Sequence, residues 1–348
     1  MRFIHTADNH LGATPDSGMP WSKERAQALW DTFRKIIAAA GDMQADLLLI
    51  AGDLFHQQPL QRECKEVNYL FSTIPATRVV LIAGNHDYIT PSSPYLTYPW
   101  EKNVTVLSSE TPDSVYFPEL HTEVHGFSYH RREIREALCD DLTAPDDGRF
   151  HILLAHGGDE NHVPLHMNRL ARSGFDYIAL GHIHQPHLWD KAPIAFCGSP
   201  EPLDRTDIGR HGYIIGELSE AGCQYRWQAS ASCQYRTLTA TVNTHTTTAQ
   251  LVDTLQKNLR QDGRSLYRVT LTGPRDPSVR FDPEVIRQAG RIVEITDHTE
   301  PAYDLDALQA EHAHDLVSRY IQALSGPEAT PLEQKALHYG LRALLNLD

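Results

Sequence analysis

The chain has 348 residues, enough for one large domain and a smaller one. Its apolar fraction of 41% is ordinary for a globular protein, and no stretch approaches the roughly 18 apolar residues of a membrane span. The formal net charge of -14 argues against nucleic-acid binding, because proteins that bind nucleic acids usually carry a basic surface patch. Five cysteines without Cys-x-x-Cys spacing, and no signal peptide, predict a reducing, cytoplasmic location.

Strands and helices alternate in the first part of the chain. Strands are predicted over residues 1–7, 46–51 and 78–83, with helices over 22–40 and 60–72 between them. In the first helix the apolar residues recur at spacings of three and four, which predicts a stripe facing a core. The β-α-β-α-β order predicts a parallel sheet with helices outside it, the pattern of an α/β fold.

Further elements follow in the same chain order. Strands are predicted at 104–107, 122–127, 150–155, 176–180, 194–197 and 213–218, and helices at 131–139 and 165–173. The segment 222–232 is polar and small, and predicts the boundary between a domain 1–222 and a domain 233–348. In the second domain, strands at 235–242, 266–272 and 291–296 accompany helices at 247–260, 283–288, 305–324 and 331–345. No metal-ligand motif occurs there, so this α+β part is interpreted as an accessory domain.

Five short apolar runs end in residues of metal-ligand type. These residues are Asp8, His10, Asp53, Asn85, His156, His182 and His184. Since sites in open α/β sheets form beyond the carboxyl ends of the strands, five strand ends can place them in one crevice. Mixed oxygen and imidazole ligands suit divalent Mn, Fe or Zn, and the set lacks the thiolates of a structural zinc site. Seven ligands are too many for one tetrahedral ion, so the pattern predicts two ions with a bridging carboxylate.

The two ions can be assigned on this basis. Asp53 is the predicted bridge, because a carboxylate has two oxygens to share. One ion would take Asp8, His10 and His184, and the other would take Asn85, His156 and His182. Such a pair would activate water near neutral pH and clamp phosphate oxygens during attack on phosphorus.

A departing alkoxide needs a proton, and His86 is the candidate acid. It directly follows Asn85, and Asp87 is expected to hydrogen-bond its imidazole and keep it charged. The alternative is that His86-Asp87 only caps the next turn. His56 lies three residues after Asp53 and either faces the phosphate or is an exposed loop histidine.

Three further residues are candidates for substrate binding. Asn9 would brace its loop or touch substrate. Ser199, in Gly198-Ser199-Pro200, would support a phosphate through backbone N–H groups or form an ordinary turn. Arg205 is a candidate phosphate contact, although arginines are common in loops.

In this order the motifs resemble those of the calcineurin-like metallophosphoesterase superfamily, over roughly residues 1–218: Asp8-Asn9-His10, Gly52-Asp53, Gly84-Asn85-His86-Asp87, His156 and Gly181-His182-Ile183-His184. The resemblance implies a sandwich of two mixed sheets flanked by helices, followed by a smaller capping domain. The segments 8–12 and 52–56, together with Gly198-Ser199, are similar to the Mre/SbcD branch of double-strand-break-repair nucleases. Residues 337–341 resemble its shorter, YhaO-type bacterial relatives.

That branch implies a Mn²⁺-dependent 3′→5′ exonuclease and endonuclease acting on DNA, with Mg²⁺, Fe²⁺ or Zn²⁺ as alternative ions. It implies the same seven ligands, with His86 as the catalytic histidine and His56 near the scissile phosphate. It also implies a homodimer and an SMC-like ABC ATPase partner of the SbcC type. Two rival hypotheses are a phosphodiesterase or phosphatase for small substrates at the same site, and a scaffold protein with an inert site. The second rival is disfavoured because no ligand is missing.

Overall fold

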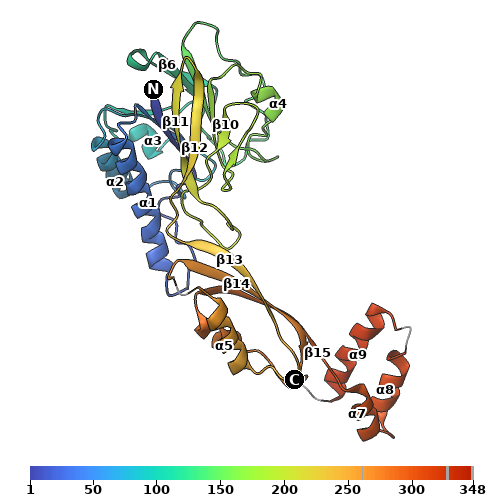
Figure 1. The fold of residues 1–348 in the computed structure, drawn as a ribbon. Coiled ribbons are helices and arrows are strands. Elements are labelled where there is room, and N and C mark those ends of the chain that lie inside the picture. Colours follow the sequence, from blue (N-terminus) through green and yellow to red (C-terminus); the bar gives the residue numbers. More distant parts are fainter. Residues whose placement is uncertain (261, 327–328, 346–348) are drawn as a thin grey trace. The chain divides into compact units, whose positions relative to one another are not determined.

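The computed structural model describes residues 1–260, 262–326 and 329–345. Contacts divide the chain into two compact units, Met1–Gln234 and Tyr235–Asp348, which are described separately below (Figure 1). Within the described ranges, none of the helices has both the length and the apolarity to cross a bilayer.

The first unit is built on two six-stranded sheets. One has the order β12-β11-β1-β2-β3-β4, with β1 (Arg2–Thr6), β2 (Leu47–Ala51), β3 (Arg78–Ile82), β4 (Val104–Val106), β11 (Gly212–Ser219) and β12 (Gly222–Ala229). The other has the order β5-β6-β7-β8-β10-β9, with β5 (Asp113–Phe117), β6 (Thr122–Gly126), β7 (Phe150–His156), β8 (Tyr177–Gly181), β9 (His187–Leu188) and β10 (Ile194–Phe196). Both sheets are mixed: β1, β2, β3 and β4 run parallel, as do β6, β7, β8 and β10, with antiparallel strands at the edges.

The core lies on both faces of each sheet, because central strands such as β2 place apolar side chains on both sides. Side chains alternate across a strand, so Leu47 and Leu49 of β2 pack between the two sheets while Leu48 and Ile50 face the helices. Helices α1 (Ser22–Asp42) and α2 (Gln61–Ser72) cover that outer face. Three short helices complete the unit: α3 (Pro94–Thr97), η1 (Pro118–Leu120) and α4 (Met167–Leu170). The predicted layered α/β fold is thereby confirmed.

Two helix predictions in this unit are wrong. The helix predicted over 131–139 is a loop, because Ile134 is buried and pairs with a distant segment: its N–H donates to the Asn161 carbonyl at 2.9 Å. Within the segment 165–173, which is predicted to be helical, only the residues of α4, Met167–Leu170, form a helix. The segment 222–232, in which the domain boundary is predicted, holds β12, whose Tyr225 and Trp227 alternate toward the core between the sheets, and the first unit continues to Gln234.

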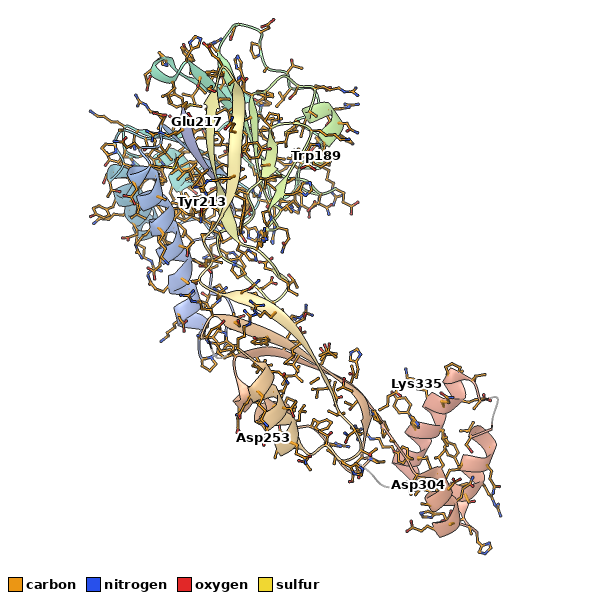
Figure 2. All side chains as sticks on the ribbon, viewed as in Figure 1. Trp189, Tyr213, Glu217, Asp253, Asp304 and Lys335 are labelled. Carbon is orange, nitrogen blue, oxygen red and sulfur yellow. The ribbon has the colours of Figure 1, made fainter. Side chains whose placement is uncertain are left out.

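The second unit contains a three-stranded sheet, β13-β14-β15, in which β14 and β15 run parallel. Its elements are β13 (Gln234–Thr241), α5 (Thr248–Asn258), β14 (Ser265–Arg275), α6 (Pro283–Ile286), η2 (Arg287–Ala289), β15 (Ile292–Pro301), α7 (Leu305–Glu311), α8 (Leu316–Leu324) and α9 (Pro331–Leu344). Asp304, labelled in Figure 2, caps α7 by accepting from the Ala307 N–H at 2.9 Å. The predicted single helix 305–324 is wrong, because Asp315 accepts from the Val317 N–H and starts a separate helix.

Candidate dinuclear metal centre

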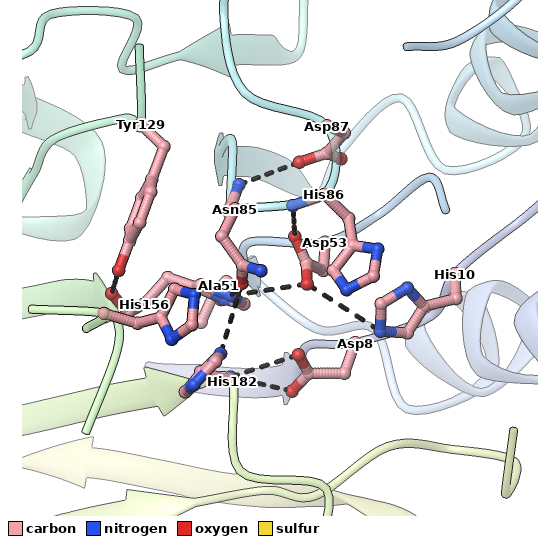
Figure 3. Close-up of polar contacts among 12 residues, drawn as sticks. Asp8, His10, Ala51, Asp53, Asn85, His86, Asp87, Tyr129, His156 and His182 are labelled. Carbon is pink, nitrogen blue, oxygen red and sulfur yellow. Dashed lines mark hydrogen bonds and ion pairs between the residues drawn. The ribbon is translucent and has the colours of Figure 1, made fainter. Parts of the chain in front are cut away.

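All seven side chains predicted as metal ligands gather at the carboxyl ends of five strands in the first unit (Figure 3 labels six of them). Asp8, Asp53 and Asn85 follow β1, β2 and β3, which run parallel in one sheet. His156 ends β7 and His182 follows β8, which run parallel in the other sheet. The cluster therefore forms where the two sheets present the same ends of their strands.

Asp53 lies at the middle of the cluster. Its Oδ2 is 3.7 Å from Nε2 of His10 and 3.4 Å from Nε2 of His156. Its Oδ1 accepts a hydrogen bond from the His86 backbone N–H at 2.9 Å, as Figure 3 shows. One carboxylate thus faces donors from both sheets, which is the placement that a bridging ligand needs.

A donor set lies on each side of Asp53. On one side, Nε2 of His10 is 3.3 Å from Nε2 of His184, and Asp8 completes the group. On the other side, Oδ1 of Asn85 is 2.9 Å from Nε2 of His156 and 3.2 Å from Nδ1 of His182. Asp8 also lies close to Asp53 and His156, so the division of these side chains between two ions stays a prediction.

These spacings fit divalent cations. Ligand atoms about 2.1 Å from one ion lie about 3 Å from each other, close to the separations within each group. The two facing nitrogens of His10 and His184 need either a proton or a cation between them. Burial raises the pKa of Asp8 to about 6 and lowers the pKa of His10 well below its usual value. Nearby cations would relieve the cost of burying Asp8 as a carboxylate.

The backbone at the site is strained. Asp8, His10, Asp53 and His182 all have positive φ, at 51°, 46°, 49° and 92°. Non-glycine residues seldom adopt this left-handed region, and such strain clusters where function requires a fixed geometry. The turns after β1, β2 and β8 therefore direct these side chains toward one another at a cost in local stability.

Two glycines allow the elements to approach this closely. A Cβ on Gly84 would lie 2.2 Å from Oδ1 of Asp53, and a Cβ on Gly181 would lie 2.0 Å from the carbonyl oxygen of Ala51. Only glycine fits at either position. The two motifs therefore contain glycine for a steric reason: a larger residue would prevent the strand ends from approaching each other.

His86 and Asp87 are not arranged as predicted. The His86 imidazole donates from Nδ1 to the His56 carbonyl at 3.1 Å, not to Asp87. Asp87 is buried and instead accepts from the Phe55 N–H at 3.0 Å, the Gly84 N–H at 2.8 Å and the Tyr95 hydroxyl at 2.5 Å. Burial raises the pKa of Asp87 to about 7, with the Asp53 charge adding to the effect. Successive residues of a tight turn point in different directions, so Asp87 braces the loop that carries Asn85 and His86.

His56 and Asn9, by contrast, both lie at the cluster. Nδ1 of half-buried His56 is 3.4 Å from Nδ1 of His10, and its ring stacks on that of His86 with centroids 5.1 Å apart. Asn9 is buried, and its Oδ1 accepts from the Thr6 hydroxyl at 3.3 Å. This bond braces the loop, and a role of Asn9 in substrate binding stays a prediction.

Ser199 and Arg205 are placed differently from each other. Ser199 is buried with its hydroxyl 2.9 Å from Nδ1 of His211, so the side chain points into the protein. Arg205 lies exposed in the loop between β10 and β11. A role in substrate binding stays a prediction for both residues.

The partners that hold the histidines are not predicted by the sequence. Nδ1 of His156 is 2.8 Å from the Ala51 carbonyl, while carboxylates of Asp159 and Asp207 contact His182 and His184. Both aspartates lie in loops without a motif, and they reach the site only through the fold. No local pattern in the sequence marks them.

Comparisons with known proteins agree with this geometry. The model of the Calcineurin-like phosphoesterase family matches residues 1–186, more than half of the chain. The chain is 28% identical over 298 residues to a protein of Bacillus subtilis described as the uncharacterized metallophosphoesterase YhaO, covering 78% of this chain and 72% of that protein.

More distant relatives have names that include a function. The chain is 27% identical to the DNA double-strand break repair protein Mre11 of Methanocaldococcus jannaschii, over 60% of this chain and 58% of that protein. It is 24% identical to a component of the nuclease SbcCD of Escherichia coli K12, over 62% of this chain and 64% of that protein. The matches thus span less than two thirds of these two relatives. From the family match and the clustered donors we conclude that the chain belongs to the calcineurin-like phosphoesterase family of metal-dependent hydrolases.

Proposed function

We propose that this protein is a two-metal phosphodiesterase that cuts DNA, as a Mn²⁺-dependent 3′→5′ exonuclease and endonuclease in double-strand-break repair. The observation that carries the proposal is the Asp53 carboxylate, which faces His10 on one side and His156 on the other, each within a complete set of donors. The relatives named as Mre11 and as a component of the nuclease SbcCD support DNA as the substrate.

The reaction follows from the chain's own residues. When bound, divalent cations neutralise phosphate charge and activate water for in-line attack. Asp53 would be shared by both ions, with Asp8, His10 and His184 holding one and Asn85, His156 and His182 holding the other. Backbone contacts keep the carboxylates in place: the His182 N–H lies 3.1 and 3.0 Å from the two oxygens of Asp8. The donors are thus positioned before substrate arrives, which is how such sites gain rate.

His86 is proposed to donate the proton to the leaving oxygen. Its Nδ1 faces the His56 carbonyl, so Nε2 is the nitrogen left for substrate when the ring is protonated. General acid catalysis of this kind contributes about 10²–10⁴-fold in rate. His56, in contact with His10 and stacked on His86, is proposed to lie near the scissile phosphate, where it would orient both rings.

The net charge of -14 bears on the choice of substrate. A strongly acidic protein repels a polyanion, so the alternative, a phosphodiesterase or phosphatase for small substrates at the same site, has a specific observation in its favour. Two bound divalent cations, and a basic partner, would offset the repulsion. The proposal also includes an SMC-like ABC ATPase as the partner, a homodimer, and the second unit as an accessory capping domain.

The test is cleavage of end-labelled linear duplex DNA in Mn²⁺, comparing wild type with His86→Ala and Asp53→Ala. His245→Ala, at an exposed position of the second unit, is the matched histidine control. Cleavage by wild type and the control, lost in both site variants, would support the nuclease and its site together. If wild type leaves DNA intact but hydrolyses bis-p-nitrophenyl phosphate, the phosphodiesterase stands and the DNA substrate is rejected for the isolated chain.

A further inference from the structure

The two histidines of the Gly181-His182-Ile183-His184 motif each contact a carboxylate outside the set of predicted ligands. Nε2 of His182 is 2.8 Å from Oδ2 of Asp159. Nδ1 of His184 is 3.1 and 3.0 Å from the two oxygens of Asp207. In each ring the other nitrogen faces the donors, with Nδ1 of His182 near Asn85 and Nε2 of His184 near His10.

These contacts assign the tautomers. A ring nitrogen that donates its hydrogen to a carboxylate leaves the opposite nitrogen with a lone pair for a cation, and the carboxylate makes that nitrogen a stronger ligand. With an ion at the opposite nitrogen, the hydrogen would lie on Nε2 in His182 but on Nδ1 in His184. Among the residues that the structure describes, no carboxylate outside the ligand set contacts the other two histidines: His156 has the neutral Ala51 carbonyl at 2.8 Å, and His10 has the His56 ring at 3.4 Å.

The two carboxylates differ in their surroundings. The Asp207 side chain is only 13% exposed, and the Leu203 N–H donates to it at 2.8 Å. The Asp159 side chain is 44% exposed and is shared with the ring of His162, whose Nδ1 lies 2.9 Å from each oxygen. Water competes with His182 for Asp159, whereas Asp207 is held against His184 in a more buried place, where such a contact is stronger.

Asp159, His162 and His182 also lie close enough together to suggest a separate metal site. That interpretation fails on the chemistry of His182. If Nδ1, which faces Asn85, binds the predicted ion, a separate ion at Nε2 would leave the imidazole without any N–H hydrogen, as an imidazolate anion. The oxygens of Asp159 are instead engaged with the two rings.

We propose that Asp207 and Asp159 are positioning residues, each acting through one histidine on one ion, and that they give the two sites unequal affinities. The ion held through His184 is the tightly bound one, and the ion held through His182 is the exchangeable one. This inference rests on the two-metal site of the proposed function, but it does not depend on DNA as the substrate.

The test is a titration of the metal-free protein with Mn²⁺, in which the free ion is counted by its solution EPR signal. Wild type is expected to bind two ions with separate affinities. Asp207→Asn keeps the shape but removes the charge, and should weaken the tight class about 10–100-fold. Asp159→Asn should weaken the other class and leave the tight one unchanged.

Neighbouring acids provide matched controls. Asp204→Asn lies in the loop of Asp207, and Glu160→Gln is adjacent to Asp159; both residues are exposed, and both variants should titrate like wild type. Thermal unfolding of each variant separates a change in affinity from a loss of folding. If Asp207→Asn does not fold, Asp159→Asn still decides the matter, because it must affect one class only.

Either of two results would overturn the assignment: both Asn variants titrate like wild type, or each weakens the two classes equally. The readout is binding, so it is distinct from the failure of the proposed function. Two Mn²⁺ classes that respond as expected in a protein that never cuts DNA would keep the inference and reject the nuclease.

Discussion

Replacing Asp87 by Asn distinguishes the role seen in the structure from the one suggested by the sequence. Above a pKa of about 7 the Asp87 carboxylate is ionised and accepts from the Phe55 N–H, the Gly84 N–H and the Tyr95 hydroxyl. An Asn side chain has one acceptor, so it turns an NH₂ group toward at least one buried donor. Since each buried hydrogen bond to a charged group contributes about 1.5–3 kcal/mol, we expect Asp87→Asn to lower the free energy of unfolding by about 2–4 kcal/mol at pH 8.

The assay is urea unfolding at pH 8, combined with the pH profile of phosphodiester hydrolysis. Tyr95→Phe is the control, because it removes one donor and leaves the carboxylate, and it should cost about 1–2 kcal/mol. Both variants should keep the pH profile of wild type, since Asp87 does not contact the His86 imidazole. A variant Asp87→Asn that unfolds like wild type but shifts the pH profile would refute this reasoning and restore an Asp87–His86 pair.

Three further predictions concern the site and the core. Gly84→Ala places a methyl group 2.2 Å from Oδ1 of Asp53, so it should abolish Mn²⁺ binding and hydrolysis together, whereas a variant that still binds two ions would contradict the steric argument. Burial lowers the pKa of His5 to about 3, so the unfolded chain takes up the proton first as the pH falls below 6.5, and stability is lost on that side. His5→Gln should therefore lose about 2 kcal/mol less than wild type between pH 8 and pH 5 in urea unfolding; equal losses would reject the contribution. Chelation with EDTA should lower the melting temperature, since each ion present at 100 times its Kd contributes about 2.7 kcal/mol, and an unchanged melting temperature would argue against resident ions.

The sequence alone indicated which residues gather at the site, because that information is local. A buried strand is recognised in the sequence as a short apolar run, and the residue after the run lies at the carboxyl end of the strand. Asp8, Asp53, Asn85, His156 and His182 all follow such runs, and the parallel sheets bring their ends together. The fold class followed from the same alternation of strands and helices.

Only the tertiary structure decided what surrounds these residues, because the partners come from distant segments. Asp87 accepts hydrogen bonds from Phe55 and Tyr95. Ile134 lies in a loop, not in the predicted helix, because its backbone pairs with residues 161–163. Asp159 and Asp207 carry no motif, yet they select the tautomers of His182 and His184. Side-chain hydrogen bonds depend on direction and on distances of a few tenths of an ångström, and these are set by packing between segments that the sequence pattern does not relate.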